Sequence, residues 1–199
     1  MMRQQYHSEQ TTVESEQIDW EQAQQATRLL LDAIGEDPDR TGLAETWQRR
    51  LPATLETLTE GQRNDAKPDL RTFEAETNDL VIKTGIPVYS LCEHHMLPYH
   101  GTAHIGYRPN GKVVGLSKLP RYVRWQSRRL TIQETLTRNI AEGLADEIHA
   151  EAVLVEITAT HLCEAMRGIE AATETTTQTT VGEVTSDERR RFREAIKHE

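Results

Sequence analysis

Apolar residues in the first third of the chain recur at three- and four-residue spacing, which is typical of amphipathic helices. The pattern predicts a first helix that begins after Asp19 and ends near Gly35. A turn-rich segment, 36–42, separates it from a second helix predicted from about Leu43. Pro52 is expected to kink or restart this second helix, because proline lacks the N–H that helical hydrogen bonding needs.

From about residue 80 onwards, alternating apolar residues predict strands, and helical spacing returns between them. The predicted strands are 80–92, 102–107, 113–116, 153–159 and 173–181. The predicted helices are 119–126, 132–148 and 187–198, the last with Ser186 as its cap. Strand pairs alternate with helices, so we expect an α+β fold with an antiparallel sheet and a packed helix pair.

Composition divides the chain into three parts. Residues 1–17 are rich in Gln, Glu, Ser and Thr and are predicted to be a disordered tail. Residues 18–72 form a predicted N-terminal helical region, which ends in a polar connector over 60–72. Residues 73–199 contain all of the predicted strands, and we expect them to form the domain that carries the chemistry.

The chain of 199 residues is acidic, with a formal net charge of −9. This charge argues against binding to nucleic acid or to an anionic membrane surface. Only 36% of the residues are apolar, so part of the apolar surface is expected to lie between subunits. No stretch approaches the roughly 20 apolar residues of a membrane helix. The polar N-terminus lacks the core of a signal peptide, so a cytoplasmic location is expected.

Both cysteines of the chain lie beside histidines. The sequence CEHH occupies residues 92–95, and HLC occupies residues 161–163. Thiolate sulfur and imidazole nitrogen are ligands that zinc prefers, and three protein ligands leave a fourth position for water, as in catalytic zinc sites. We therefore predict a zinc site formed by Cys92, His95 and Cys163.

Two further histidines, His94 and His161, stand beside these predicted ligands. Imidazoles close to a metal are suited to proton transfer at physiological pH. The competing interpretation of the cysteines is a disulfide between Cys92 and Cys163, which a reducing compartment disfavours.

Basic residues gather where a predicted strand leads into the next short helix. Lys118 and Arg121 follow Ser117 at the start of that helix, and a helix N-terminus with two cations is suited to hold phosphate oxygens. Arg167, four residues after Cys163, adds a third cation near the predicted metal. Taken alone, this group is also typical of a solvated charged surface.

Five blocks of sequence, taken in order, resemble the GTP cyclohydrolase I family over residues 36–182. They are SLCEHH at 90–95, HIGY at 104–107, GLSK at 115–118, QETLT at 133–137 and ATHLCEAMRG at 159–168. The resemblance implies the tunnelling fold, assembled as a toroidal homodecamer of two pentamers with sites at subunit interfaces. It also implies an enzyme that converts GTP and water to 7,8-dihydroneopterin triphosphate and formate, at the entry to folate or other pterins.

The same resemblance implies a role for each candidate residue. Zinc would be held by Cys92, His95 and Cys163 and would activate the water that attacks C8 of the purine. His161 would protonate the imidazole nitrogen as that ring opens, and His94 would transfer protons at the ribose. Gln133 and Glu134 would bind guanine. Ser117, which is counted with the catalytic residues, would contact the ribose or phosphates. The triphosphate would be held by Lys118, Arg121, Arg167 and Arg49.

The chain departs from the family pattern in the second predicted helix, which usually reads Thr-Pro-x-Arg-Val-Ala and then a basic residue. Arg49 keeps the arginine, but Pro52 stands where a lysine that contacts phosphate is expected. Losing one cation would weaken phosphate binding by roughly 1–3 kcal/mol, or would accompany a different product, such as a cyclic phosphate.

Two alternatives remain open beside GTP cyclohydrolase. One is a related enzyme that acts on a pterin or a deazaguanine; the deazaguanine reductases use a cysteine nucleophile without zinc. The other is a zinc-stabilised assembly protein without turnover, in which loss of Cys163 would break the oligomer.

Overall fold

The computed structural model describes residues 18–76 and 78–197, and its centre is a five-stranded sheet. The strands are β1 Thr72–Glu74, β2 Val81–Cys92, β3 Pro98–Arg108, β4 Lys112–Val114, β5 Leu130–Thr131, β6 Ala152–His161 and β7 Glu174–Gly182. The order in the large sheet is β5-β2-β3-β6-β7, and β1 pairs with β4 in a separate small sheet. All pairings are antiparallel except that of β5 with β2, which is parallel.

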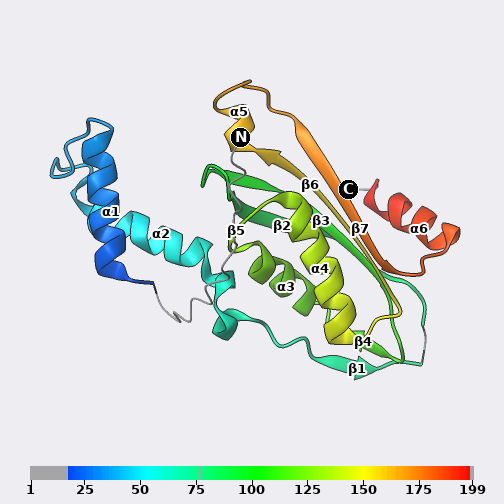
Figure 1. Ribbon diagram of the computed structural model, residues 1–199. Helices are drawn as coiled ribbons and strands as arrows, with labels where there is room; N and C mark the ends of the chain where they lie inside the picture. The colour runs from blue at the N-terminus through cyan, green and yellow to red at the C-terminus, as the bar shows by residue number, and fades with distance from the viewer. Residues whose placement is uncertain (1–17, 77, 198–199) are drawn as a thin grey trace, which may run out of the picture.

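Helices lie at both ends of this sheet and over one of its faces (Figure 1). They are α1 Trp20–Ala33, the π-helical turn η1 Thr46–Arg50, α2 Leu51–Leu58, the short 3-10 turns η2 Glu60–Gln62 and η3 Asn64–Ala66, α3 Lys118–Ser127, α4 Gln133–Ile148, α5 Leu162–Ala165 and α6 Ser186–Ile196. The α1 and α2 helices extend away from one end of the sheet, while α6 lies near the other end. In the described part of the chain, no helix is both long and apolar enough to cross a bilayer.

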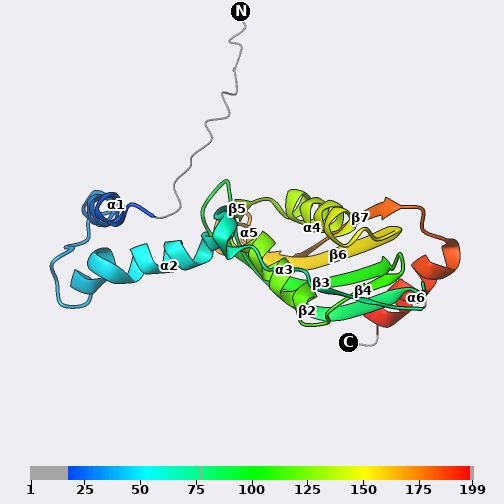
Figure 2. The same ribbon diagram turned by 90° about the horizontal axis from the view of Figure 1, so that it is seen from below.

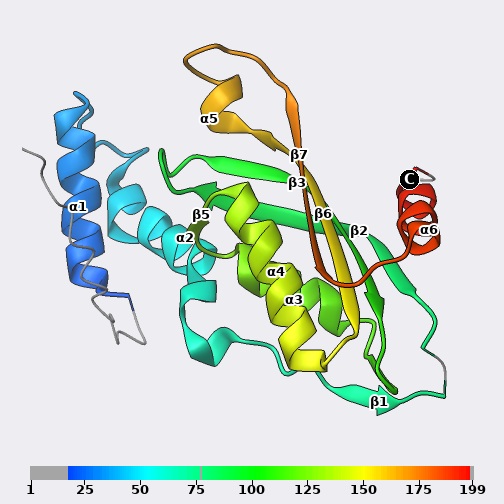
Figure 3. The same ribbon diagram turned by 45° about the vertical axis from the view of Figure 1, so that its right-hand side comes forward.

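One face of the sheet is covered by α3 and α4, which lie side by side (Figure 3). Alternate residues of β6, such as Val155 and Ile157, point into the core beneath these helices and pack with Ile140 of α4. A glycine allows the two helices to approach each other, because a Cβ at Gly143 would lie 2.1 Å from the Tyr122 hydroxyl oxygen. The core therefore fixes α4 against the strand that leads to His161.

The opposite face carries a smaller apolar cluster beneath α6 (Figure 2). Phe192 of α6 packs there with Leu80 and Leu154. The helix is capped by Thr185 and not by Ser186, so that sequence prediction is wrong by one residue. The Thr185 hydroxyl accepts a hydrogen bond from the Glu188 N–H, and the Glu188 carboxylate accepts one from the Thr185 N–H, which together form a capping box.

The predicted helices of the N-terminal region are present, and the second changes from π-helical to α-helical hydrogen bonding next to Pro52, where a kink or restart was predicted. The second helix begins as the π-helical turn η1, in which the Leu51 N–H donates to the Thr46 carbonyl. Pro52 then stands in the first turn of α2, where a missing N–H does least harm. The predicted tail at 1–17 and the end of the last predicted helix, His198, lie outside the described residues.

The strands differ from the sequence prediction in three places. β3 begins at Pro98, four residues earlier than predicted. Its first residues show no apolar alternation, so the sequence pattern did not reveal them as part of the strand. β1 begins at the end of the predicted connector, and β5 has only two residues, too few to produce a period. The α+β class with a mainly antiparallel sheet and a packed helix pair is confirmed.

Candidate metal centre and active site

A tight turn after β2 carries the CEHH sequence. Cys92 is the last residue of β2 and is buried, while the histidines that follow it are exposed. The Cys92 N–H donates to the Leu97 carbonyl at 2.9 Å, and the Met96 N–H donates to the Cys92 carbonyl at 2.8 Å. Met96 adopts a φ of 53°, the left-handed conformation that closes the turn before β3. The turn therefore holds His95 beside Cys92.

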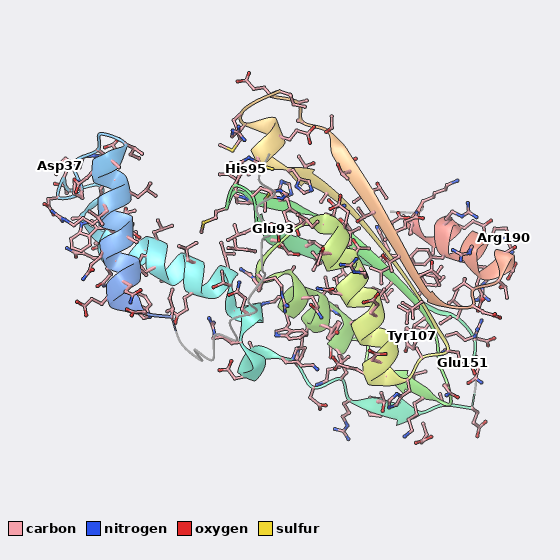
Figure 4. The ribbon with its side chains drawn as sticks, in the orientation of Figure 1. Asp37, Glu93, His95, Tyr107, Glu151 and Arg190 are labelled. Atoms are coloured by element: carbon pink, nitrogen blue, oxygen red, sulfur yellow. The ribbon has the colours of Figure 1, made fainter. Side chains whose placement is uncertain are left out.

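The second cluster reaches the same place from β6. This strand ends at His161, which caps the one-turn helix α5, and Cys163 lies on that helix. The Cys92 Sγ, one ring nitrogen of His95 and the Cys163 Sγ all lie within 4.8 Å of one another. Figure 4 shows His95 at the end of β2, beside α5. Segments far apart in the sequence thus place three metal-ligating atoms together.

The three donors fit a zinc ion. A tetrahedral zinc with bonds of about 2.0–2.3 Å separates its ligand atoms by roughly 3.5–3.8 Å. The Cys92 Sγ lies 3.9 Å from His95 Nδ1, which is close to this spacing. Both cysteines are free thiols, so the structure does not support the alternative of a disulfide between them.

Electrostatics also favour a cation between the two sulfurs. Burial, and then the neighbouring Cys92 thiol, raises the pKa of Cys163 above its ordinary value. Two thiolates at this spacing would repel each other, and a divalent cation between them removes the repulsion. A zinc ion held by these residues would therefore let both sulfurs be ionised at once.

His161 lies on the buried side of this cluster. Its Nε2 is 2.8 Å from the Oε1 of Gln133, and its ring stacks on Tyr99 with 4.6 Å between the ring centroids. Burial lowers the pKa of His161, and the carboxylates of Glu134 and Glu164 oppose this effect. His94, by contrast, is exposed, with its Nδ1 3.9 Å from the Cys92 Sγ.

Gln133 does not have the surroundings expected of a residue that grips guanine. Its side chain is only 1% exposed. Its Nε2 lies 2.9 Å from the Ile157 carbonyl oxygen and 2.8 Å from the Thr175 carbonyl oxygen. Both hydrogens of the Nε2 therefore have acceptors within the protein, and the expected contact with guanine stays a prediction. The next residue, Glu134, is exposed at the start of α4.

The residues predicted to bind phosphate lie at the end of α3 that is far from the metal cluster. Ser117 precedes α3, and Lys118 and Arg121 lie in its first turn, next to the small β1–β4 sheet. The end of α3 leads into β5, which pairs with the last residues of β2. A ten-residue helix is about 15 Å long, so one chain does not bring these cations to Cys92.

The remaining two predicted cations also lie apart from each other. Arg167 follows α5 and is exposed near the metal cluster. Arg49 belongs to η1, in the N-terminal region, where it forms an exposed ion pair with Glu45 at 3.0 Å. The same carboxylate also pairs with Arg50. Pro52 is buried, and its side chain carries no charge, so it offers no contact to a phosphate.

Tyr99 is the residue of this site that the sequence did not predict. It lies opposite His161 in the register of β3 and β6, which explains the stacking of the two rings. Beginning β3 at Pro98 would have brought Tyr99 into the sheet, and its pairing partner would then have followed from antiparallel register. The missing start of the strand concealed this residue.

Comparison with known proteins agrees with this geometry. The sequence matches the model of a family described as GTP cyclohydrolase I over residues 23–197. The chain belongs to this family. The cluster of Cys92, His95 and Cys163 fits the zinc site of GTP cyclohydrolase I.

Relatives named GTP cyclohydrolase 1 include proteins from three different organisms. The protein of Corynebacterium aurimucosum is 46% identical over 83% of this chain and 85% of the relative. That of Hyperthermus butylicus is 45% identical over 86% of each chain, and that of Clostridium perfringens is 42% identical over 86% of this chain and 93% of the relative. Among solved structures, the apo form of the archaeosine synthase QueF-Like matches 55% of this chain and 100% of its own, with 16% identity and a TM-score of 0.41.

Proposed function

We propose that the protein converts GTP and water to 7,8-dihydroneopterin triphosphate and formate. The observation that carries this proposal is the convergence of Cys92, His95 and Cys163 within 4.8 Å, beside the half-buried His161, in a member of the GTP cyclohydrolase I family. Zinc held by these residues would supply Lewis-acid activation of water at neutral pH. Reduced thiols suit a reducing compartment, and we place the reaction in the cytoplasm.

The residues around the cluster divide the remaining work. His161 is held on the buried side, where its imidazole would hand a proton to the imidazole nitrogen of the opening purine ring. His94 is exposed beside Cys92 and would move protons at the ribose. Glu134 is exposed at the start of α4, where its carboxylate would accept hydrogen bonds from the guanine N1–H and amino group.

The phosphate-binding residues come from a second copy of the chain in this proposal. Ser117, Lys118 and Arg121 would meet the metal cluster of a neighbouring copy, because they lie too far from the cluster of their own chain. Arg167 would add a cation from the metal side. Arg49 would contribute only after giving up its ion pair with Glu45.

We also propose that the copies assemble as a decamer of two pentamers. The sheet supports this proposal, because within residues 18–76 and 78–197 β7 pairs only with β6 and most of β2 has no strand on its outer side. Unpaired strand edges favour pairing with another chain. Exposed apolar residues at the end of α1, Leu29, Leu30 and the following Ile34, would be covered in the same assembly.

The first test is the reaction itself. Purified protein is incubated with GTP, formate is measured, and the product is oxidised to fluorescent neopterin. We expect both products, their loss after treatment with a chelator, and their recovery when zinc is restored. Zinc-loaded protein that releases no formate would overturn the proposed activity.

The mass of the product from GTP resolves the question raised by Pro52. A triphosphate is expected if Lys118, Arg121 and Arg167 suffice to hold the phosphates. A cyclic phosphate would show that the missing cation changes the product.

Two substitutions separate an enzyme from a zinc-stabilised assembly. We expect His161→Ala to lower kcat by roughly 10²–10⁴-fold while zinc content stays at wild-type level, because His161 moves a proton and is not a ligand. His100→Ala, at an exposed position of β3, is the matched control and should stay near wild type. Cys163→Ser should lose zinc and activity but keep the assembly; loss of the assembly would favour the structural role.

A further inference from the structure

The orientation of the Gln133 amide is fixed by its acceptors. Its Nε2 faces the carbonyl oxygens of Ile157 and Thr175 at 2.9 and 2.8 Å, and these atoms can only accept hydrogen bonds. The reverse orientation would place Oε1 against two carbonyl oxygens and lose both bonds. The Oε1 must therefore face His161, at 2.8 Å from its Nε2.

A neighbouring hydroxyl chain completes the hydrogen bonding. Thr137 donates to the Gln133 carbonyl at 2.7 Å, so its hydroxyl oxygen must accept from Thr177 at 2.6 Å. The Thr177 oxygen can then share one of the two Gln133 Nε2 hydrogens, at 3.2 Å from the nitrogen. Both polar atoms of the Gln133 side chain thus have partners within the protein.

This arrangement determines which nitrogen of His161 faces the reaction. An amide oxygen only accepts, so the Nε2 of His161 must carry the hydrogen in their shared bond. The nitrogen left for the substrate is then Nδ1, which can give up a proton only from the imidazolium form, in which both ring nitrogens carry hydrogen. Tyr99 fixes the plane of the ring as well, since the two rings stack with 11° between their planes.

We propose that Gln133 is a positioning residue that acts through His161, and that it holds the imidazole with Nε2–H toward the core and Nδ1 toward the substrate. This inference rests on the proposed function, and it moves Gln133 from guanine recognition to the alignment of the proton donor. Guanine recognition on α4 then falls to Glu134, which is exposed where Gln133 is buried.

The test is the substitution Gln133→Met, which keeps the length of the side chain and removes both polar atoms. We expect kcat for GTP to fall by about 100-fold because the imidazole loses its alignment. The KM should stay within about twofold of wild type. Binding of 7-deaza-GTP, which lacks the nitrogen to be protonated, should also stay within about twofold. Glu134→Gln is the contrasting variant, with raised KM and weaker binding of the analogue.

A double-mutant cycle separates positioning from a general structural effect. In the His161→Ala background, Gln133→Met should change kcat by less than about twofold, because its effect passes through the imidazole that is already absent. A structural role or a contact with guanine would lower kcat by the same factor in both backgrounds and would overturn the inference. Weaker binding of 7-deaza-GTP to Gln133→Met, by about tenfold or more, would also overturn it.

Controls keep the result interpretable. Gln126→Met makes the same exchange at another buried glutamine, whose Nε2 donates to the Tyr122 hydroxyl, and should leave kcat and KM unchanged. If Gln133→Met does not assemble, Gln133→Asn retains an amide that is too short to join His161 to both carbonyls and undergoes the same measurements. Wild-type protein without formate release would overturn the proposed function and this inference with it; an active wild type with contrary variants overturns the inference alone.

Discussion

At the scale of single residues, Tyr99 supports the site with its ring and not with its hydroxyl. The side chain is fully buried and stacks on His161. Its hydroxyl makes no hydrogen bond of normal geometry, although Ser90 lies close enough to act to lower its pKa. Burial dominates and raises the pKa of Tyr99 to about 12, so the hydroxyl stays protonated at physiological pH.

We therefore expect Tyr99→Phe to retain activity within about twofold of wild type, because the stacked ring is kept. The free energy of unfolding should stay equal or rise by about 1 kcal/mol, since a buried hydroxyl without a partner is removed. Denaturant unfolding and steady-state kinetics measure the two effects. Tyr99→Leu is the control that removes the stack, and it should lower kcat. A marked loss of stability in Tyr99→Phe would show that the hydroxyl has a partner.

Sequence reasoning identified the metal-ligating residues but not their support. Cysteine and histidine are common zinc ligands, so two short clusters of them were enough to predict a zinc site that the geometry fits. Glutamine has no such signature. The role of Gln133 depends on the carbonyl oxygens of Ile157 and Thr175, whose positions no spacing in the sequence reveals.

At the scale of elements, α6 is held by a small polar joint. Glu188 closes the capping box with Thr185 and also accepts a hydrogen bond from Arg108 at 2.8 Å. Burial acts to raise the pKa of Glu188, but the hydrogen bonds from Thr185 and Arg108 outweigh it and leave the pKa lowered. The ionised carboxylate therefore ties α6 to the end of β3.

This joint predicts a pH-dependent loss of stability. Because the pKa of Glu188 is lower in the folded state, its ionisation stabilises the fold above the unfolded value near 4.5, and that stability is lost as the pH falls through the folded pKa. We expect Glu188→Gln to lower the free energy of unfolding by roughly 1–2 kcal/mol at pH 7. The difference should shrink below about pH 4.5.

Denaturant unfolding at several pH values measures this difference. Glu194→Gln, at an exposed ion pair with Arg190, is the control and should have little effect at any pH. An equal loss in Glu188→Gln at pH 7 and at pH 3 would contradict the explanation, because the effect would then come from shape and not from charge.

The same scale explains which elements the sequence could predict. Long periodic segments, such as those of α1 and α4, were predicted close to their observed bounds. β5 was missed because two residues are too few to show an alternation of apolar and polar positions. The beginning of β3 was missed because it contains Pro98 and Gly101 and shows no such alternation. Tertiary pairing, and not local preference, makes these segments strands.

At the scale of the whole molecule, the residues of the proposed site form two separate groups, one near each end of α3. The metal cluster lies at the end of β2, and the α3 cations lie at the far end of that helix. Sequence analysis grouped each set by residue type, but the order of residues along one chain does not say whether two groups meet within a copy or between copies. Only the arrangement of α3 along the sheet shows the separation.

A mixing experiment tests the shared site directly. Cys163→Ser lacks a metal ligand and Lys118→Ala lacks a phosphate ligand, so each variant alone should be nearly inactive. Rings reassembled from equal amounts would contain some sites with an intact metal cluster and an intact neighbouring lysine. Random mixing should restore about a quarter of wild-type activity. No recovery from verified mixed rings would show that both groups serve the same copy's site.

The shortest strand of the molecule joins two parts of the site. Thr131 of β5 pairs with Cys92, and Glu134 follows only three residues later. Only a short stretch of backbone therefore separates the Glu134 carboxylate, proposed to select the base, from the Cys92 sulfur, proposed to bind the metal. A single inserted residue there would shift the purine relative to the reactive water, whereas the same insertion at the 109–111 turn would leave that spacing untouched. The alignment of the two groups therefore depends on the length of this segment more than on its side chains.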